Sequence, residues 1–406
     1  MIIGVFMEIK DEYDIIVVGG GPAGSSAAEA CAKNGLSVLL LEKRAEIGAP
    51  KRCGEGLSDN SVKALKLKIP KNCIRQNING AYIYAPNGKD IKIQFKGSQG
   101  YIVERKMFDK WLAENASRAG AKIITKADVY DLIIENIAGK DFVKGVKVNI
   151  MGKEYAIKSK IVVAADGVES LTMRKAGIRS NKNPKLVDSG FQYEMCNIKL
   201  RDSHMIELYL GNKIARRGYV WIFPKGKNIA NVGIGILGSG CEKTAKQYLD
   251  EFIESKNELK KGSILEVNAG CVPVGGLMKN MVGNGIVGVG DAVNQVNPIH
   301  GGGIAESIFS GRIAGEVITK AIKKGDYSEK FLSEYNKIWW KKRGKRLENI
   351  EKIREAFENM SDENMNDLSG ILRGEDLTDF TRGNYAKLAK IMIKYKIKSL
   401  VRFVGV

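Results

Sequence analysis

The stretch that decides the fold is residues 13–43, YDIIVVGGGPAGSSAAEACAKNGLSVLLLEK. Its apolar run at 15–18 predicts a buried strand, the glycines that follow predict a tight turn, and residues 22–33 predict a helix. A second apolar run at 38–41 predicts another strand, which ends at Glu42. This order of strand, turn, helix, strand and acid is typical of a unit that binds a dinucleotide.

The three glycines of this turn have separate roles in such a unit. Gly19 permits the tight turn, Gly21 lets the backbone approach a pyrophosphate, and Gly24 lets the helix pack close to the strand. The helix N-terminus adds free N–H groups and a positive dipole end for the phosphates. Glu42 lies about 20 residues on, where a carboxylate accepts from ribose hydroxyls. The sequence therefore predicts a dinucleotide cofactor and redox chemistry.

Length and composition bound the kind of protein. The chain has 406 residues with 44% hydrophobic and 27% charged side chains, which predicts two or three globular domains. No apolar run approaches the ~18 residues that span a bilayer. The first residues lack the basic region of a signal peptide, so we expect a cytoplasmic protein. The six cysteines include no Cys-x-x-Cys pair, which argues against a disulfide framework, an iron–sulfur cluster or any metal site.

The charge of the chain points to anionic partners. Lys and Arg number 65 against 46 Asp and Glu, a formal net charge of +19. Because no nucleic-acid motif accompanies this charge, we expect no nucleic-acid binding, and an acidic redox protein or an anionic membrane surface instead. In the tail, residues 385–406, basic residues recur nearly every four positions among apolar ones. This predicts a helix that lies on the inner face of the cell membrane or docks on its own core. A solvated Lys-rich surface is the alternative explanation of the charge.

The expected fold class is α/β: a Rossmann-like nucleotide-binding domain with an inserted antiparallel-sheet domain and a helical C-terminal region. The nucleotide-binding domain is predicted to be discontinuous and to comprise residues 8–75, 101–185 and 275–325. Strand-rich segments 76–100 and 186–274 would form the sheet domain that carries the substrate. Residues 326–406 would form the helical, basic C-terminal region.

Two further motifs resemble signatures of the p-hydroxybenzoate-hydroxylase-like flavoproteins. The Ala-Ala-Asp-Gly at 164–167 resembles their second signature, in which the Asp-Gly lies by the pyrophosphate. The Gly-Asp at 290–291 resembles their third, whose Asp accepts from ribityl hydroxyls of the flavin. Arg105 resembles the arginine that these proteins lay against FAD. This resemblance implies that the cofactor is FAD.

Within that group the chain resembles the archaeal geranylgeranyl reductases, which saturate isoprenoid chains of membrane lipid precursors. Three motifs carry the resemblance: KRCGEG at 51–56, YVWIFP at 219–224 and NPIHGGGI at 297–304. Arg216 is a departure, because the family often has proline three residues before the tyrosine. Together with the glycine turn, the resemblance implies FAD contacts from Gly19, Gly21, Ala23, Gly24, Glu42, Cys53, Gly54, Gly56, Arg105, Val129, Asp166, Asp291, Gly303 and Ile304.

Two parts of these motifs suggest roles in the reaction. Cys53 is a candidate catalytic thiol, since thiolates near positive charge are reactive and Arg52 adjoins it. Tyr219, Trp221 and Phe223 alternate as in a strand, so all three would face one side. That face, with His300, would line a pocket for a polyprenyl chain, or it would be ordinary core packing. The helix that begins near Ile304 would direct its positive end toward the flavin.

The resemblance implies an FAD-dependent reductase of geranylgeranyl chains on an archaeal glycerophospholipid. A hydride would leave N5 of reduced FAD for one alkene carbon, and a proton would reach the other. Reduced ferredoxin, a deazaflavin and NAD(P)H stay open as electron donors, and we expect a monomer. The alternatives are a flavin monooxygenase or halogenase, an electron-transfer flavoprotein component, and a lipid carrier that keeps flavin structurally.

Overall fold

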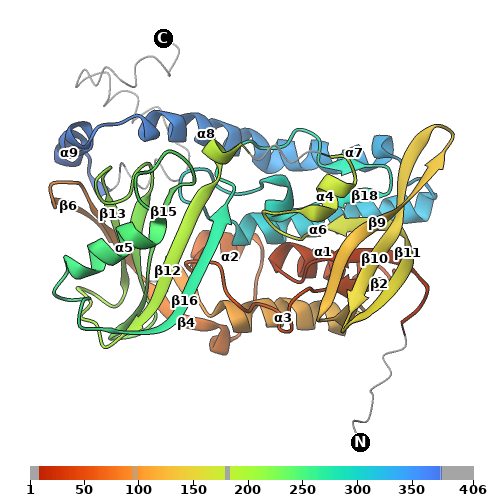
Figure 1. Ribbon diagram of the computed structural model, residues 1–406, viewed down its shortest axis with the longest axis horizontal. Coiled ribbons are helices and arrows are strands. Elements are labelled where there is room, and N and C mark those ends of the chain that lie inside the picture. Colours follow the sequence, from red (N-terminus) through yellow and green to blue (C-terminus); the bar gives the residue numbers. More distant parts are fainter. Residues whose placement is uncertain (1–8, 95–96, 98, 179–182, 375, 377–406) are drawn as a thin grey trace, which may run out of the picture.

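The computed structural model describes residues 9–94, 97, 99–178, 183–374 and 376. Figure 1 shows an elongated molecule with one sheet toward each end of its long axis and C-terminal helices along one side. Among the described residues, none of the helices has the length and apolar character that crossing a bilayer requires.

The first sheet has a parallel centre. Its order is β17 (Val282–Gly283), β18 (Ile286–Gly288), β11 (Lys153–Ala164), β1 (Glu12–Val18), β2 (Val38–Leu41) and β8 (Lys122–Ile124). All neighbours in this row are parallel except β17 and β18. Ile15, Ile16, Leu39 and Val162 are fully buried, as expected for central strands covered on both faces. The strands and helix predicted within residues 13–43 are therefore confirmed.

Two antiparallel strands, which are not part of this row, join the sheet through β11. They are β9 (Ala127–Ile137) and β10 (Lys140–Ile150), and β10 pairs with the long β11. The helices of this half are α1 (Pro22–Lys33), α3 (Arg105–Arg118), α4 (Leu171–Lys175) and α6 (Ile304–Lys324). Helices α1 and α6 pack so closely that a Cβ on Gly311 would lie 2.3 Å from the carbonyl oxygen of Ala23.

The second sheet has seven strands. Their order is β16 (Ser263–Val272), β12 (Asp188–Cys196), β15 (Ile229–Leu237), β14 (Tyr219–Pro224), β13 (Met205–Leu210), β5 (Gly80–Tyr84) and β6 (Asp90–Gln94). Helix α5 (Ala245–Glu254) packs its apolar side on one face of this sheet. All pairs are antiparallel except β13 with β5. These two strands can be parallel because the chain passes through the first sheet between them, so no hairpin joins them.

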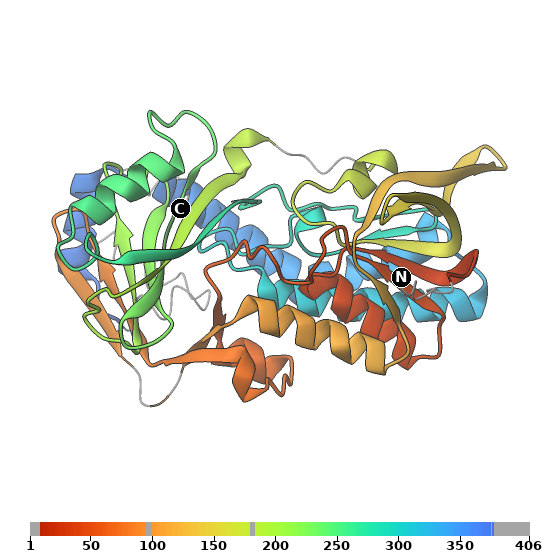
Figure 2. The same cartoon turned by 60° about the horizontal axis from the view of Figure 1, so that its bottom comes forward.

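A small three-stranded sheet lies between the two large ones. It contains β3 (Gly56–Ser58), β7 (Gly100–Val103) and β4 (Ile74–Ile78), with the short helix α2 (Asp59–Ala64) beside it. In Figure 2, α3 (light orange) runs from this region along the lower side of the first sheet. The chain also forms short helical turns at η1 (Lys71–Cys73), η2 (Pro184–Leu186) and η3 (Gly290–Val293).

The C-terminal helices link the two halves. Helix α7 (Glu329–Trp339) continues through a π-turn, η4 (Trp340–Gly344), into α8 (Lys345–Glu358), and α9 (Asp362–Ile371) follows. Trp339 is buried in the core of the first sheet, whereas the backbone N–H of Asn212, beyond β13, donates to Asp362 at 2.7 Å. Figure 1 shows this run (blue) along the long axis. The predicted α/β fold with a helical C-terminal region is confirmed, and the basic tail helix lies outside the described residues.

Candidate functional site

The glycine turn between β1 and α1 has one position that faces no protein. A Cβ on Gly19 would lie 2.4 Å from the oxygen of Ala165, and a Cβ on Gly24 would lie 1.9 Å from the oxygen of Gly19. Gly19 also has φ +105°, which favours glycine. Gly21 has no atom within 4 Å of its Cβ position. The fold therefore requires Gly19 and Gly24, while Gly21 leaves a cradle in which a pyrophosphate fits against the N-terminus of α1.

Glu42 is held at the end of β2 by the same turn. Its Oε2 accepts from the Gly20 N–H at 2.8 Å and its Oε1 from the Arg44 N–H at 2.9 Å. A carboxylate has about four acceptor sites, so others stay available for ribose hydroxyls. The Ala127 N–H donates to the Glu42 carbonyl at 2.9 Å, which brings the start of β9, and with it Val129, to this side of the turn. Val129 is buried and pairs with Val148, so a contact from it would be through the backbone.

Asp166 lies beside the glycine turn, but its side chain is occupied. Its Cα is 3.2 Å from the Cβ position of Gly19. Its carboxylate accepts from Ser170 Oγ at 2.8 Å and from the N–H and Oγ1 of Thr172 at 2.9 and 2.8 Å. These bonds anchor the start of α4. Asp166 would therefore face a pyrophosphate through its backbone.

The third motif brings Asp291 to the N-terminus of α6. A Cβ on Gly290 would lie 2.9 Å from Cβ of Ala23, and a Cβ on Gly303 would lie 3.2 Å from Oδ1 of Asp291. Ala23, Asp291 and Gly303 are thus neighbours although the motifs are far apart in sequence. The first turn of α6 begins at Ile304 and presents N–H groups beside this carboxylate.

Cys53 lies in the loop formed by residues 51–56, which packs against β14. The Glu55 N–H donates to Cys53 Sγ at 3.2 Å, and Gln192 Nε2 donates to the Cys53 carbonyl at 3.2 Å. A Cβ on Gly54 would lie 2.9 Å from the ring of Phe223, and one on Gly56 would lie 3.4 Å from it. A side chain at Gly54 would therefore collide with the ring, whereas at Gly56 the loop lies in ordinary van der Waals contact with it.

The cation beside Cys53 is Arg105. Burial lowers the pKa of the Arg105 guanidinium, but Asp109 and Cys53 outweigh this and hold that pKa well above its usual range. The guanidinium donates to both carboxylate oxygens of Asp109, at 2.8 and 2.7 Å. Arg52, the sequence neighbour expected beside Cys53, instead directs its guanidinium toward Glu169 at 3.8 Å.

The aromatic side chains of β14 form one continuous face, as the alternation predicts. Ring centroids are 5.8 Å apart for Tyr219 and Trp221, and 6.1 Å apart for Trp221 and Phe223. The Tyr219 hydroxyl donates to the His300 carbonyl at 2.8 Å, so one end of this face meets loop 297–303. Its other end meets loop 51–56 at Gly54. The two loops predicted to line the flavin thus meet on one half-buried aromatic strand.

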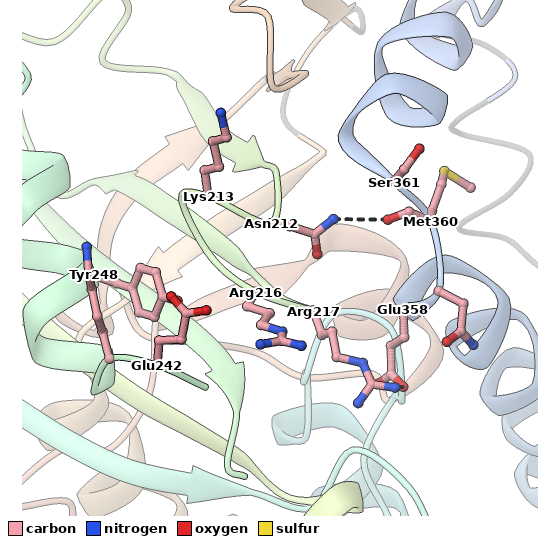
Figure 3. A pocket seen from close by; sticks show the side chains of 11 residues that line it. Asn212, Lys213, Arg216, Arg217, Glu242, Tyr248, Glu358, Met360 and Ser361 are labelled. Atoms are coloured by element: carbon pink, nitrogen blue, oxygen red, sulfur yellow. Dashed lines mark hydrogen bonds and ion pairs between the residues drawn. The ribbon is translucent and has the colours of Figure 1, made fainter. Parts of the chain in front are cut away.

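A separate cavity of about 830 Å³ opens at the turn between β13 and β14. In Figure 3, Arg216 and Arg217 extend from this turn toward Glu358 of α8, and a side-chain hydrogen bond joins Asn212 to the carbonyl of Met360. Arg216, the departure from the family pattern, lines this cavity, which contains none of the predicted site residues. The lining residues are Asn212, Lys213, Arg216, Arg217, Glu242, Lys243, Tyr248, Glu358, Asn359, Met360 and Ser361.

No sequence pattern indicated the set of polar residues that lies in loop 51–56 and on its inner side. Trp221 Nε1 donates to Gln192 at 2.9 Å, and Asn231 Nδ2 donates to the Gly54 carbonyl at 3.3 Å. Glu55 and Lys225 are completely buried and ion-paired at 2.8 Å. The one signal for Lys225 is a charge directly after the apolar strand that ends at Pro224. Within the described part of the chain, no group of His, Cys, Asp and Glu has the arrangement of a metal site.

Comparisons with known proteins agree with this geometry. Residues 14–181 match the family model for FAD-dependent oxidoreductases, and residues 187–272 match that for the geranylgeranyl reductase catalytic domain. The chain is 43% identical to digeranylgeranylglycerophospholipid reductase 2 of Methanococcoides burtonii, with 97% of this chain and 95% of the relative covered. It is 41% identical to the digeranylgeranylglycerophospholipid reductase of Methanocaldococcus jannaschii, with coverages of 96% and 99%.

Solved structures show the same relationship. A geranylgeranyl bacteriochlorophyll reductase-like protein from Thermoplasma acidophilum superposes with a TM-score of 0.88 at 35% identity, over 95% of this chain and 99% of the other. A flavin-dependent brominase shares the fold, with a TM-score of 0.68 at 20% identity over 88% and 94%. The chain therefore belongs to the digeranylgeranylglycerophospholipid reductase family of FAD-dependent oxidoreductases.

Proposed function

We propose that this FAD-dependent geranylgeranyl reductase of archaeal lipid synthesis holds the isoprenoid chain of its phospholipid substrate against the aromatic face of β14. One observation carries the proposal: loop 51–56 and loop 297–303 meet this face at its two ends, through Gly54 and Tyr219. A lipid chain on the face would lie between the two loops expected to contact the flavin. Each CH₂ group buried there contributes about 0.8 kcal/mol.

The FAD would be held by the glycine turn, Glu42, the backbone beside Asp166, and Asp291 with the start of α6. When bound and reduced, FAD supplies a hydride, so that the C=C π bond breaks and one carbon gains the hydride while the other gains a proton. The aromatic face excludes water from the alkene. The positive end of α6 would stabilise negative charge beside Gly303.

Cys53 is the proposed proton donor. Its Sγ already accepts from the Glu55 N–H and lies beside the Arg105 guanidinium. Both groups would stabilise the thiolate left when Sγ gives its proton to the alkene carbon. Solvent would return the proton between turnovers.

The test of the reaction is mass spectrometry of a geranylgeranyl phospholipid after anaerobic incubation with dithionite-reduced protein. The lipid should gain two hydrogens for each reduced double bond while the flavin reoxidises. A lipid of unchanged mass over a flavin that stays reduced would contradict the reductase, and a requirement for oxygen would favour a monooxygenase.

The electron donor, the oligomeric state and contact with a membrane are also part of this proposal. Ferredoxin, a deazaflavin and NAD(P)H all stay open as the electron donor, and a monomer is still expected. The net charge of +19 favours an acidic donor or an anionic membrane surface, where a cytoplasmic enzyme would meet its lipid.

A further inference from the structure

Six charged side chains, two of them from loop 51–56, meet at the junction of the first and second sheets. They are Lys51, Glu55, Glu104, Glu194, Lys225 and Glu266. The side chains of Lys51, Glu55 and Lys225 have no exposed surface. We call this set the buried charge cluster.

Lys225 is the centre of the cluster. It follows β14, and its Nζ lies 2.8 Å from Glu55, 2.9 Å from Glu104 and 2.7 Å from Glu194. These carboxylates come from loop 51–56, from the residue before α3, and from β12. Burial lowers the pKa of Lys225, but its three acidic partners outweigh this and hold that pKa above its usual value. Lys225 is thus charged and bonded to both halves of the molecule.

Both carboxylate oxygens of Glu55 also accept hydrogen bonds. Its Oε1 accepts from the Arg105 N–H at 2.8 Å, and its Oε2 accepts from Asn231 Nδ2 at 2.7 Å beside Lys225. Its backbone has φ +74°, a left-handed conformation that is unfavourable for a residue with a Cβ. The side-chain bonds of Glu55 therefore keep a strained backbone in place.

Stability alone does not account for such a cluster. The desolvation of buried ions offsets most of their attraction, so apolar side chains of similar volume would stabilise the fold as well or better. The strain at Glu55 adds a further cost, and it lies between Cys53 and Gly56, where the loop touches the aromatic face of β14. Strain of this kind concentrates at functional sites.

We propose that Glu55 and Lys225 are positioning residues, which clamp loop 51–56 in its left-handed turn and so fix Cys53 and Gly54 against the aromatic face. This inference rests on the proposed function. The clamp acts through the loop and touches neither lipid nor flavin. A loop released from Lys225 would let Cys53 Sγ and the Gly54 backbone move relative to Phe223.

The test uses three full-length variants. Lys225→Met and Glu55→Gln each remove one charge at nearly constant volume, and the double variant removes both together. Lys320→Met removes a lysine from an exposed ion pair with Glu334 and is the matched control. Each protein is measured for its thermal midpoint, for oxidation of its reduced flavin over a range of lipid concentrations, which gives the maximal rate and the KM, and for alkylation of Cys53 by iodoacetamide, read by peptide mass spectrometry.

Each single variant should lower the oxidation rate per bound FAD by roughly 10- to 100-fold, because a shift of about 1 Å in a reacting group has an effect of this size. The KM for lipid should change little, and Cys53 should alkylate faster. The double variant should recover part of the thermal midpoint, since Glu55 and Lys225 are removed together, Glu194 keeps Lys51, and Glu104 is the carboxylate that loses its ion pair with Lys225. Its oxidation rate should stay low and its alkylation fast.

Recovery of the rate together with the thermal midpoint in the double variant would overturn the proposal, because the cluster would then be structural only. Unchanged alkylation in all three variants would overturn it as well. Alkylation of Cys53 needs no turnover. If the wild-type protein fails to reduce any lipid, the proposed reaction fails while the clamp is still judged by alkylation.

Discussion

At the scale of single residues, two glycines of one turn are expected to serve different purposes, Gly21 cofactor binding and Gly24 packing. Gly21 has φ −72° and an open Cβ position, whereas a Cβ on Gly24 would lie 1.9 Å from a backbone oxygen. We expect Gly21→Ala to weaken FAD binding by about tenfold or more, or 1.4 kcal/mol, without changing the thermal midpoint of the apoprotein. Gly24→Ala should lower that midpoint, at a cost of about 1–3 kcal/mol. Titration with FAD and melting of the apoproteins check both, and an unstable Gly21→Ala apoprotein would contradict the distinction.

Asp188 gives the protein a pH-dependent weakness. Burial raises the pKa of its carboxyl from 3.8 to about 7, because Glu358 adds to the effect of burial and Arg354 and Arg217 only partly offset it. Its Oδ1 has no hydrogen-bond partner. Between pH 4 and 7 the unfolded chain has lost this proton while the folded chain keeps it, so folding becomes less favourable as pH rises.

We therefore expect Asp188→Asn to stabilise the protein increasingly from about pH 4 to pH 7, and by a constant amount above. The gain should reach roughly a few kcal/mol, since each pKa unit corresponds to about 1.4 kcal/mol. Thermal melting of both proteins over this range measures it. Parallel curves for the two proteins would show that Asp188 titrates normally.

At the scale of elements, we expect the two faces of β14 to have different roles, one in binding the lipid chain and the other in stability. Phe223 lies half-buried on the aromatic face, and Ile222 is buried on the opposite face, in the core that also contains the apolar residues of α5. Phe223→Ala should raise the KM for the lipid several-fold, because chain contacts and the support of Gly54 are lost. Ile222→Ala should leave KM unchanged and destabilise the fold by about 2–5 kcal/mol. Steady-state kinetics with melting checks the pair, and equal effects on KM would contradict a wall on one face.

At the scale of the whole molecule, we expect the net charge to govern the encounter with lipid. With a net charge of +19, the protein should sediment with vesicles that contain anionic phospholipid and stay in solution with neutral ones. Binding should weaken steeply as salt rises, since the Debye length falls to about 8 Å at physiological ionic strength. Binding to neutral vesicles, or binding insensitive to salt, would instead indicate apolar insertion.

Much of the fold and the cofactor turn could be predicted because their signals are local. The strand, glycine turn and helix at residues 13–43 each follow from neighbours within a few positions, and so does the single face shared by Tyr219, Trp221 and Phe223. The role of Arg105 beside Cys53 was not visible in this way. Adjacency in sequence suggested Arg52, but the loop turns that side chain toward Glu169.

The sequence by itself thus determined the dinucleotide turn, the order of the elements and the aromatic strand, since periodicity and glycine positions act over short distances. Only the tertiary structure decided which segments meet. The contact of Gly54 with Phe223, the bond from Tyr219 to His300, and the ion pair of Glu55 with Lys225 each join residues far apart in the chain. Sheet pairing and the junction between the two halves create these contacts, and no local pattern specifies which buried charge will find which partner.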